Sequence, residues 1–151
     1  MARPVILCID DEELGLEIRK MVLEREGFTV LTARDGQTGL SIFGTERVDA
    51  VVLDYAMPGM DGGQVAAILR KRQADIPILM LSAYVALPEE VMRVVSISAT
   101  KGDGAFTLVD NSRNGTWLNG RRLARGSEEK LPERAEIGIA EVLKLSFEAR
   151  K

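Results

Sequence analysis

Apolar and polar residues follow two spacings along residues 1–101, and each spacing predicts one kind of element. Short runs of β-branched and other apolar residues, bounded by polar or turn residues, predict strands. Between these runs, apolar residues that recur every three or four positions predict helices. The expected strands cover residues 5–9, 28–31, 48–53, 76–81 and 96–101, and the expected helices cover residues 14–26, 36–43, 63–73 and 88–95. Such alternation is typical of a parallel sheet built from right-handed β-α-β units.

The pattern changes after residue 101. Gly102-Asp103-Gly104 predicts a tight turn or a linker. Two Asn-Gly pairs follow, Asn114-Gly115 and Asn119-Gly120, and each favours the two-residue turn of a β-hairpin. Strand-type runs cover residues 106–109, 116–118 and 143–147. We therefore expect antiparallel β-hairpins in this part of the chain.

One stretch near the end of the sequence allows two interpretations. Residues 134–149 have the propensity of a helix, but Gly138 and the alternation of apolar residues over 143–147 favour strands. If residues 134–149 form strands, all the elements expected after residue 101 are strands. The chain then divides into an α/β domain over residues 1–101 and a hairpin segment over residues 102–151.

Composition narrows the class of protein. Hydrophobic residues make up 46% of the 151 residues and charged residues 28%, which suits a soluble chain with a core. The formal net charge of −3 does not indicate a nucleic-acid partner. Cys8 is the single cysteine, so no disulfide framework exists, and we expect a cytoplasmic location. We expect no signal peptide, because the N-terminus runs directly into a strand with an acidic end. We expect no membrane span, because no apolar run approaches the roughly 20 residues that cross a bilayer.

Polar residues stand at the ends of four predicted strands: Asp10 with Asp11, Asp54, Ser82 and Lys101. Because the carboxyl ends of parallel strands lie along one edge of a sheet, we expect these side chains to share a pocket. Clustered carboxylates repel one another unless a cation neutralises them, and Mg²⁺ prefers such oxygen ligands. An Asp beside the metal would accept a phosphoryl group as a mixed anhydride, with the serine and the lysine binding its oxygens.

Each of these residues also has a purely structural explanation. The aspartates and Ser82 suit the caps of strands or helices, and Lys101 suits a solvated strand end. Their joint occurrence at successive strand ends is what favours a phosphoryl-transfer site. Histidine is absent from the chain, which excludes His-based catalytic triads, histidine metal sites and a phosphohistidine formed by the chain itself.

Four motifs carry a resemblance to a known family: Ile9-Asp10-Asp11-Glu12, the stretch LDYAMPGMDG over residues 53–62, Leu81-Ser82-Ala83 and Thr100-Lys101-Gly102. With them, residues 1–101 resemble the receiver domain of two-component response regulators. The resemblance implies a flavodoxin-like fold, with five parallel strands in the order 2-1-3-4-5. It implies a signalling protein rather than a conventional enzyme. The only catalytic turnover that it implies is slow self-dephosphorylation.

The same resemblance assigns roles to individual residues. Asp54 is the implied phosphoacceptor, and a histidine kinase is the implied phosphodonor. Asp10, Asp11 and Asp54, with the backbone carbonyl of Ala56, are the implied ligands of Mg²⁺. Ser82 is expected to bind the phosphoryl group, and Lys101 is expected to pair with it.

The chain departs from the receiver pattern in two respects. Ser98 stands where receivers usually carry an aromatic residue, three positions before the lysine, and Gly102 stands where they often carry proline. In addition, no fifth helix follows residue 101. In receivers that helix packs beside the first one, so its loss would bare an apolar stripe on one face of the sheet.

Residues 105–149 resemble a different family. The stretch DNSRNGTWLNG over residues 110–120, the run Glu136–Ile139 and the strand that ends at Phe147 are similar to the later strands of a forkhead-associated (FHA) domain. That resemblance implies that Arg113 and Asn114 contact a phosphothreonine peptide. The first half of the β-sandwich, with its Gly-Arg and Ser-x-x-His motifs, is absent from this chain, so half of a sandwich would leave its core exposed.

Two incomplete cores in one chain suggest that each part completes the other. The hairpins over 102–151 would cover the face that the missing helix leaves bare, either within one chain or by strand swapping in a homodimer. Three functions remain open: a phosphoacceptor receiver, a phosphopeptide-binding module, and a structural chimera without signalling output. Such a join is compatible with a natural fusion and with a laboratory recombination of two families.

Overall fold

The fold was analysed in a computed structural model that describes residues 3–82, 87–102, 105–112, 115–132, 134–139 and 143–148. Its centre is a seven-stranded sheet in the order β2-β1-β3-β4-β5-β6-β9. The strands are β1 (Val5–Ile9), β2 (Thr29–Ala33), β3 (Ala50–Asp54), β4 (Ile78–Ser82), β5 (Ile97–Gly102), β6 (Ala105–Asp110) and β9 (Glu128–Lys130). The first five are parallel in the order 2-1-3-4-5, as the sequence predicts.

A second, four-stranded antiparallel sheet has the order β11-β10-β7-β8. Its strands are β7 (Thr116–Leu118), β8 (Arg121–Arg122), β10 (Arg134–Ile139) and β11 (Leu143–Glu148). The pairing of β10 with β11 confirms that the last part of the chain is strand rather than helix. The β7–β8 hairpin turns at Asn119 and Gly120, whose φ angles of 50° and 81° are those of the predicted Asn-Gly turn. Asn114, from the other Asn-Gly pair, lies outside the described residues.

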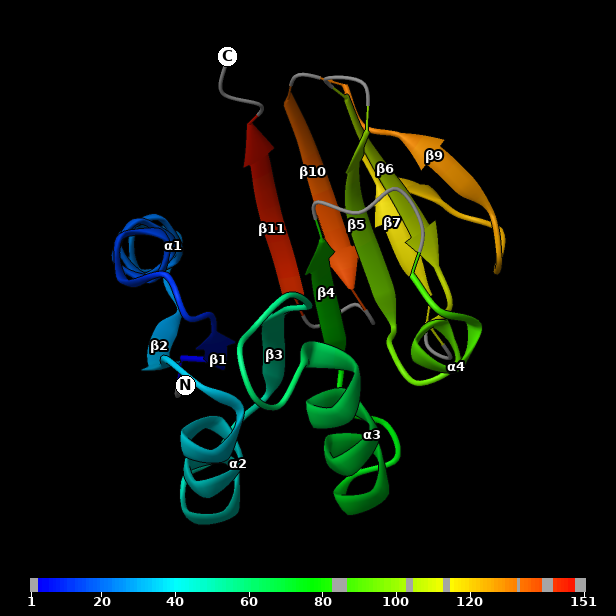
Figure 1. Ribbon diagram of the computed structural model, residues 1–151. Coiled ribbons are helices and arrows are strands. Elements are labelled where there is room, and N and C mark those ends of the chain that lie inside the picture. The colour runs from blue at the N-terminus through cyan, green and yellow to red at the C-terminus, as the bar shows by residue number, and fades with distance from the viewer. Residues whose placement is uncertain are drawn as a thin grey trace.

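The helices lie on both faces of the central sheet (Figure 1). They are α1 (Glu13–Arg25), α2 (Gly36–Thr45), α3 (Gly62–Arg72) and α4 (Glu89–Met92). The predicted helix over 88–95 was too long, because α4 ends at Met92. Val94 and Val95 follow it, and two adjacent β-branched residues are poor helix formers. Val95, buried to 2% exposure, instead packs into the core on the way to β5.

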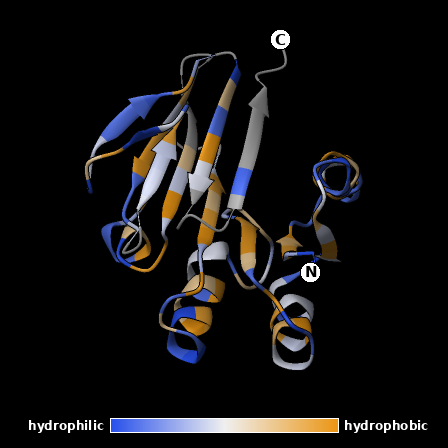
Figure 2. Cartoon of the chain, turned by 180° about the vertical axis from the view of Figure 1, so that it is seen from behind, coloured by the Kyte–Doolittle hydropathy of each residue, from blue (hydrophilic) through white to orange (hydrophobic). Residues whose placement is uncertain are grey.

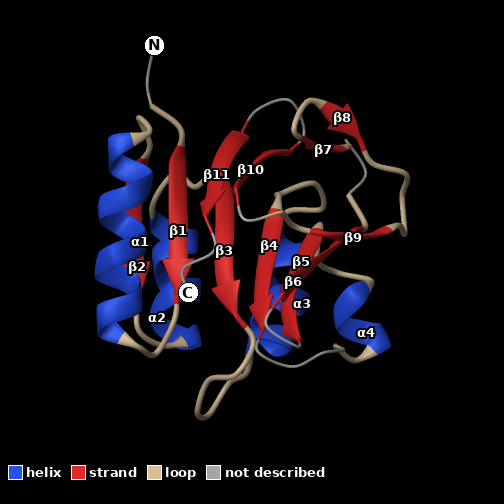
Figure 3. Cartoon of the chain, turned by 90° about the horizontal axis from the view of Figure 1, so that it is seen from above, coloured by secondary structure: helices blue, strands red, loops and turns tan. Residues whose placement is uncertain are grey.

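Two hydrophobic clusters fill the two faces of the sheet. One contains buried residues of α2, α3 and α4, among them Leu40, Val65 and Val91. The other joins α1 to the second sheet: Leu16 of α1 belongs to the same cluster as Leu118 of β7 and Ile137 of β10. α1 and the second sheet therefore lie side by side over one face (Figures 1 and 3).

Both parts of the sequence contribute to the central sheet. Directly after β5 the chain returns as β6, which pairs antiparallel with it from Ile97↔Asp110 to Gly102↔Ala105. β9 then pairs with β6 and forms one edge of the sheet, where its Glu-Glu-Lys sequence is hydrophilic (Figure 2). Leu108 of β6 is fully buried in the cluster shared with α1 and the second sheet. In the structure, the face beside α1 is thus covered by strands of the same chain.

Candidate functional site

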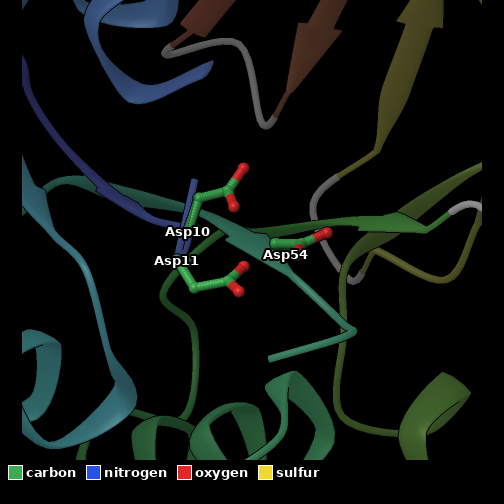
Figure 4. Close-up of side chains that lie close together, drawn as sticks. All are labelled: Asp10, Asp11 and Asp54. Atoms are coloured by element: carbon green, nitrogen blue, oxygen red, sulfur yellow. The ribbon is translucent and has the colours of Figure 1, made fainter. Parts of the chain in front are cut away.

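Three carboxylates meet at the tips of β1 and β3. Asp10 and Asp11 directly follow β1, and Asp54 is the last residue of β3. The two strands are neighbours in register, with Ile9 opposite Leu53, so their ends lie side by side. One carboxylate oxygen of each aspartate lies within 4.8 Å of the others, and the three side chains are seen together in Figure 4. The prediction that these aspartates converge is confirmed.

The turn after β3 fixes the position of Asp54. The Tyr55 amide donates to Leu81 O (2.9 Å), and the Gly62 amide donates to Tyr55 O (2.8 Å), so the loop closes over the strand end. A Cβ at Gly62 would come within 2.4 Å of Asp54 O, so only glycine allows α3 to start this close to the strand. A capping box between Asp61 and Gln64 then begins α3.

Asp10 is the most buried of the three aspartates, with 6% of its surface exposed. Both of its oxygens have partners: Oδ1 accepts from the Glu12 amide (3.0 Å), and Oδ2 accepts from the Arg19 guanidinium (2.9 Å). Arg19 comes from the second turn of α1 and forms an ion pair with Asp10. Arg19 could not be identified from the sequence, because its spacing from Asp10 gives no signal until α1 is placed against β1.

Charge and burial act together on Asp54. Burial is the largest cause that raises its pKa to about 6, followed by the nearby carboxylates of Asp10 and Asp11, while Arg19 acts in the opposite direction. A raised carboxyl pKa means that the protein disfavours the ionised form unless a cation is added. Three clustered oxygen donors of this kind fit Mg²⁺, which usually takes one or two carboxylates and keeps several waters.

The other predicted site residues lie on the same edge or outside the described part. Ser82 is buried at the end of β4, one residue beyond the Asp54↔Leu81 pair, and Ser82 is opposite Thr100 of β5. Lys101 lies within β5, directly after Thr100 and one residue before the end of the strand. β1, β3 and β4 run side by side with their carboxyl ends at one edge (Figure 3). Ala56 is exposed in the loop two residues after Asp54.

The loop that resembles an FHA motif is organised around a buried acid. Asp110, with 1% of its surface exposed, accepts through Oδ1 from the Ser112 amide (2.9 Å) and hydroxyl (2.6 Å) and from the Thr116 hydroxyl (2.7 Å). These bonds join the end of β6 to the start of β7. Arg113 and Asn114, the predicted phosphopeptide contacts, lie outside the described residues.

Comparison with known proteins identifies the first part of the chain. Residues 6–102 match the family described as response regulator receiver domain. The chain belongs to this family. Residues 95–140 match the family described as FHA domain. The two matches overlap over β5 (Ile97–Gly102), the strand that pairs with β4 on one side and with β6 on the other.

Curated relatives share the receiver part. The chain is 44% identical over 78 residues to the alkaline phosphatase synthesis transcriptional regulatory protein PhoP of Bacillus subtilis, which covers 52% of this chain and 32% of PhoP. It is 40% identical over 86 residues to the response regulator MprA of Mycolicibacterium vanbaalenii, covering 57% of this chain and 37% of MprA. The chain thus spans about a third of the length of these relatives.

Solved receiver structures support the same fold. The response regulator TrrA of Thermotoga maritima, solved in complex with Mg²⁺-BeF, is 33% identical with a TM-score of 0.62, covering 66% of this chain and 88% of that one. TrrA in complex with the histidine kinase ThkA gives a TM-score of 0.60 at 32% identity, over 66% of this chain and 86% of TrrA. The receiver part is therefore a signalling module of two-component systems. Over the described residues, no helix is long and apolar enough to cross a membrane.

Proposed function

We propose that this protein is a phosphoacceptor receiver, which is phosphorylated on Asp54 in a Mg²⁺-dependent reaction. The observation that carries the proposal is the convergence of Asp10, Asp11 and Asp54 at the tips of adjacent parallel strands. The match to the receiver family and the Mg²⁺-BeF complex of the similar TrrA support it.

In this proposal Asp10, Asp11, Asp54 and the Ala56 carbonyl hold the metal. When bound, Mg²⁺ neutralises the carboxylates and the incoming phosphoryl oxygens. The ionised Asp54 carboxylate attacks phosphorus, a bond forms from its oxygen to phosphorus, and the bond to the donor's leaving group breaks. The Ser82 hydroxyl and the Lys101 ammonium bind phosphoryl oxygens on the neighbouring strand ends.

A histidine kinase is the proposed phosphodonor, by analogy with the ThkA–TrrA complex, and the cytoplasm is the proposed location. Hydrolysis of the aspartyl phosphate in the same pocket is the one turnover that we propose. Because histidine is absent from the chain, the phosphohistidine of such a relay must come from a partner.

Labelling by acetyl phosphate tests the proposal. The protein is incubated with acetyl phosphate and Mg²⁺, and intact mass reports the addition of one phosphoryl group. We expect labelling of the parent and of Asp75→Asn, an exposed charge-matched control. We expect no labelling of Asp54→Asn or of the parent in EDTA. Equal labelling of the parent and Asp54→Asn would disprove the assignment.

A second function rests on the FHA match over residues 95–140 and on the buried Asp110 network that holds both ends of the loop. If Arg113 and Asn114 bind phosphothreonine, a phosphothreonine peptide will bind the parent more tightly than its unphosphorylated form. Arg113→Ala will remove that difference. If the two peptides bind equally, the strands after residue 102 act as structural cover, and the protein is a chimera in which only the acidic pocket has a chemical function.

A further inference from the structure

Arg19 lies next to the acidic cluster, but the phosphorylation chemistry proposed above does not use it. Its guanidinium donates to Asp10 Oδ2 at 2.9 Å, and the Asp10 side chain is only 9% exposed. With the Glu12 amide on Oδ1, both oxygens of Asp10 are therefore engaged by protein donors. Asp10 cannot offer either oxygen to a metal without sharing it or releasing a partner.

The helix leaves room for this ion pair at Gly15, one turn before Arg19. A Cβ at Gly15 would lie 3.7 Å from Asp10 Oδ2 and 3.8 Å from the Arg19 nitrogen bonded to it. A methyl group would therefore fit in ordinary contact, but a longer side chain would occupy the space where the guanidinium meets the carboxylate. Glycine inside a helix is a poor helix former, so α1 carries a local cost at the position that admits the pair.

The guanidinium is incompletely satisfied where it lies. Its other terminal nitrogen, Nη1, is buried and has no hydrogen-bond partner among the residues that the structure describes. A buried donor without a partner is unfavourable. The guanidinium therefore gains its main compensation from the negative charge of the cluster, of which Asp10 is the member that it contacts.

We propose that Arg19 is an internal counter-cation that occupies Asp10 in the metal-free protein and competes with Mg²⁺ for it. This inference rests on the proposed Mg²⁺ site. In the metal-free state the Arg19 charge neutralises part of the cluster, so the pocket stays folded without a divalent ion. When Mg²⁺ binds, the Asp10–Arg19 pair loosens, and the affinity for Mg²⁺ is lowered by the contact that must be given up.

Mg²⁺ titration of the full chain tests this inference. Affinity is measured by calorimetry on protein freed of metal with EDTA, together with the rise in Tm on adding Mg²⁺. We expect Arg19→Met to bind Mg²⁺ about five- to tenfold more tightly than the parent, the scale expected for removing a nearby unit charge after solvent screening. Its metal-free Tm should fall and its Mg²⁺-induced rise in Tm should grow. Arg19→Lys, which keeps the charge, should restore most of the parent behaviour.

Lys20→Met is the matched control, because Lys20 is the next residue of α1 and its half-exposed ammonium is paired with Glu24 rather than with the cluster. It changes net charge equally, so an effect shared by both variants would overturn the inference. Unchanged or weaker Mg²⁺ binding by Arg19→Met would overturn it too.

If Arg19→Met does not fold, Gly15→Leu displaces the pair without removing the arginine, and Gly15→Ala controls for the loss of glycine. If Gly15→Leu binds Mg²⁺ more tightly than the parent and Gly15→Ala does not, the inference is supported. If the parent and both variants bind Mg²⁺ with equal affinity, it is refuted.

These outcomes separate this inference from the proposed function. If the parent is labelled by acetyl phosphate in the presence of Mg²⁺ and Arg19→Met binds Mg²⁺ as the parent does, only the counter-cation role fails. If neither protein binds Mg²⁺ and neither is labelled, the proposed function fails, and the counter-cation role fails with it.

Discussion

The Thr116 hydroxyl donates a 2.7 Å hydrogen bond to Oδ1 of Asp110, and this bond closes the loop between β6 and β7. Both residues are buried, with 0% and 1% exposure. The bond matters to the whole molecule, because β6 belongs to the central sheet and β7 to the second sheet. The pair therefore links the two sheets through a single carboxylate.

Replacing Thr116 by valine removes this donor and keeps the shape. We expect a loss of about 1.5–3 kcal/mol in the free energy of unfolding, the range for a hydrogen bond to a charged group. Urea unfolding followed by circular dichroism measures the loss. Thr45→Val is the control, because the Thr45 hydroxyl is exposed at the end of α2 and its carbonyl bonds are long. A loss no greater than that of Thr45→Val would contradict the structural role.

The strands after residue 102 are expected to unfold together with the receiver part. Leu108 of β6 is fully buried in the cluster that also contains Leu16 of α1. Leu108→Ala should cost about 2–5 kcal/mol, the range for a buried leucine, and should shift one common transition. Val109→Ala, at a partly exposed neighbouring position, should cost less.

Two separate transitions, with only the second shifted by Leu108→Ala, would instead indicate two independent units. Size-exclusion chromatography with light scattering examines the alternative of strand swapping. Since buried residues of both parts share one cluster within a single chain, we expect a monomer.

The raised pKa of Asp54 gives the metal-free protein a defined pH dependence. The folded pKa of about 6 lies above the ordinary aspartate pKa of 3.8, so between these values the folded state binds more protons than the unfolded state. The contribution of Asp54 to stability is therefore largest below about pH 4 and is lost as pH rises through about 6. The cause is burial first, then repulsion from Asp10 and Asp11.

Urea unfolding in EDTA at several pH values, for the parent and Asp54→Asn, isolates this contribution. The parent should lose stability relative to Asp54→Asn as pH rises from about 4 to about 7. In excess Mg²⁺ the difference should shrink, because the metal favours the ionised carboxylate. Parallel pH curves in EDTA would show that Asp54 titrates at the same pH in the folded and unfolded chains.

Much of this site could be predicted from the sequence, because its residues stand at strand ends. The apolar runs that end at Asp54 and Ser82 are long enough to identify strands. In a parallel sheet the carboxyl ends of these strands lie along one edge, which brings their polar residues together. Arg19 could not be found this way, since its role depends on the rotation of α1 against β1. β8 and β9 were also missed: Arg121–Arg122 and Glu128–Lys130 carry no apolar alternation, so only pairing with a neighbouring strand identifies them.

The fate of the hairpin segment was harder to predict. Apolar and polar residues alternate along these strands whether they form half of a sandwich or extend another sheet. This alternation therefore does not identify the strand with which each one pairs. The antiparallel pairing of β6 with β5 decides the architecture. The predicted length of the helix over 88–95 was too great, because the spacing of apolar residues does not reflect the low helix propensity of adjacent valines.

Two serines near the junction of β4 and β5 provide a matched test of buried hydroxyls. The Ser96 hydroxyl accepts from the Ile78 amide at 3.0 Å and from Arg70 at 3.3 Å. The Ser98 hydroxyl, two residues along the chain and 1% exposed, is buried and has no hydrogen-bond partner within the described part of the chain. Ser96→Ala removes an acceptor and leaves a buried amide unsatisfied, so we expect a loss of about 1–3 kcal/mol.

Ser98→Ala removes an unsatisfied polar atom, so we expect no loss and a gain of up to about 1 kcal/mol. Urea unfolding of both variants in one buffer gives the comparison directly. The sign of the difference is the informative result: both changes delete one hydroxyl from a buried serine, so cavity and propensity effects largely cancel between them. If Ser98→Ala destabilises the protein as much as Ser96→Ala does, the Ser98 hydroxyl has a hydrogen-bond partner in solution.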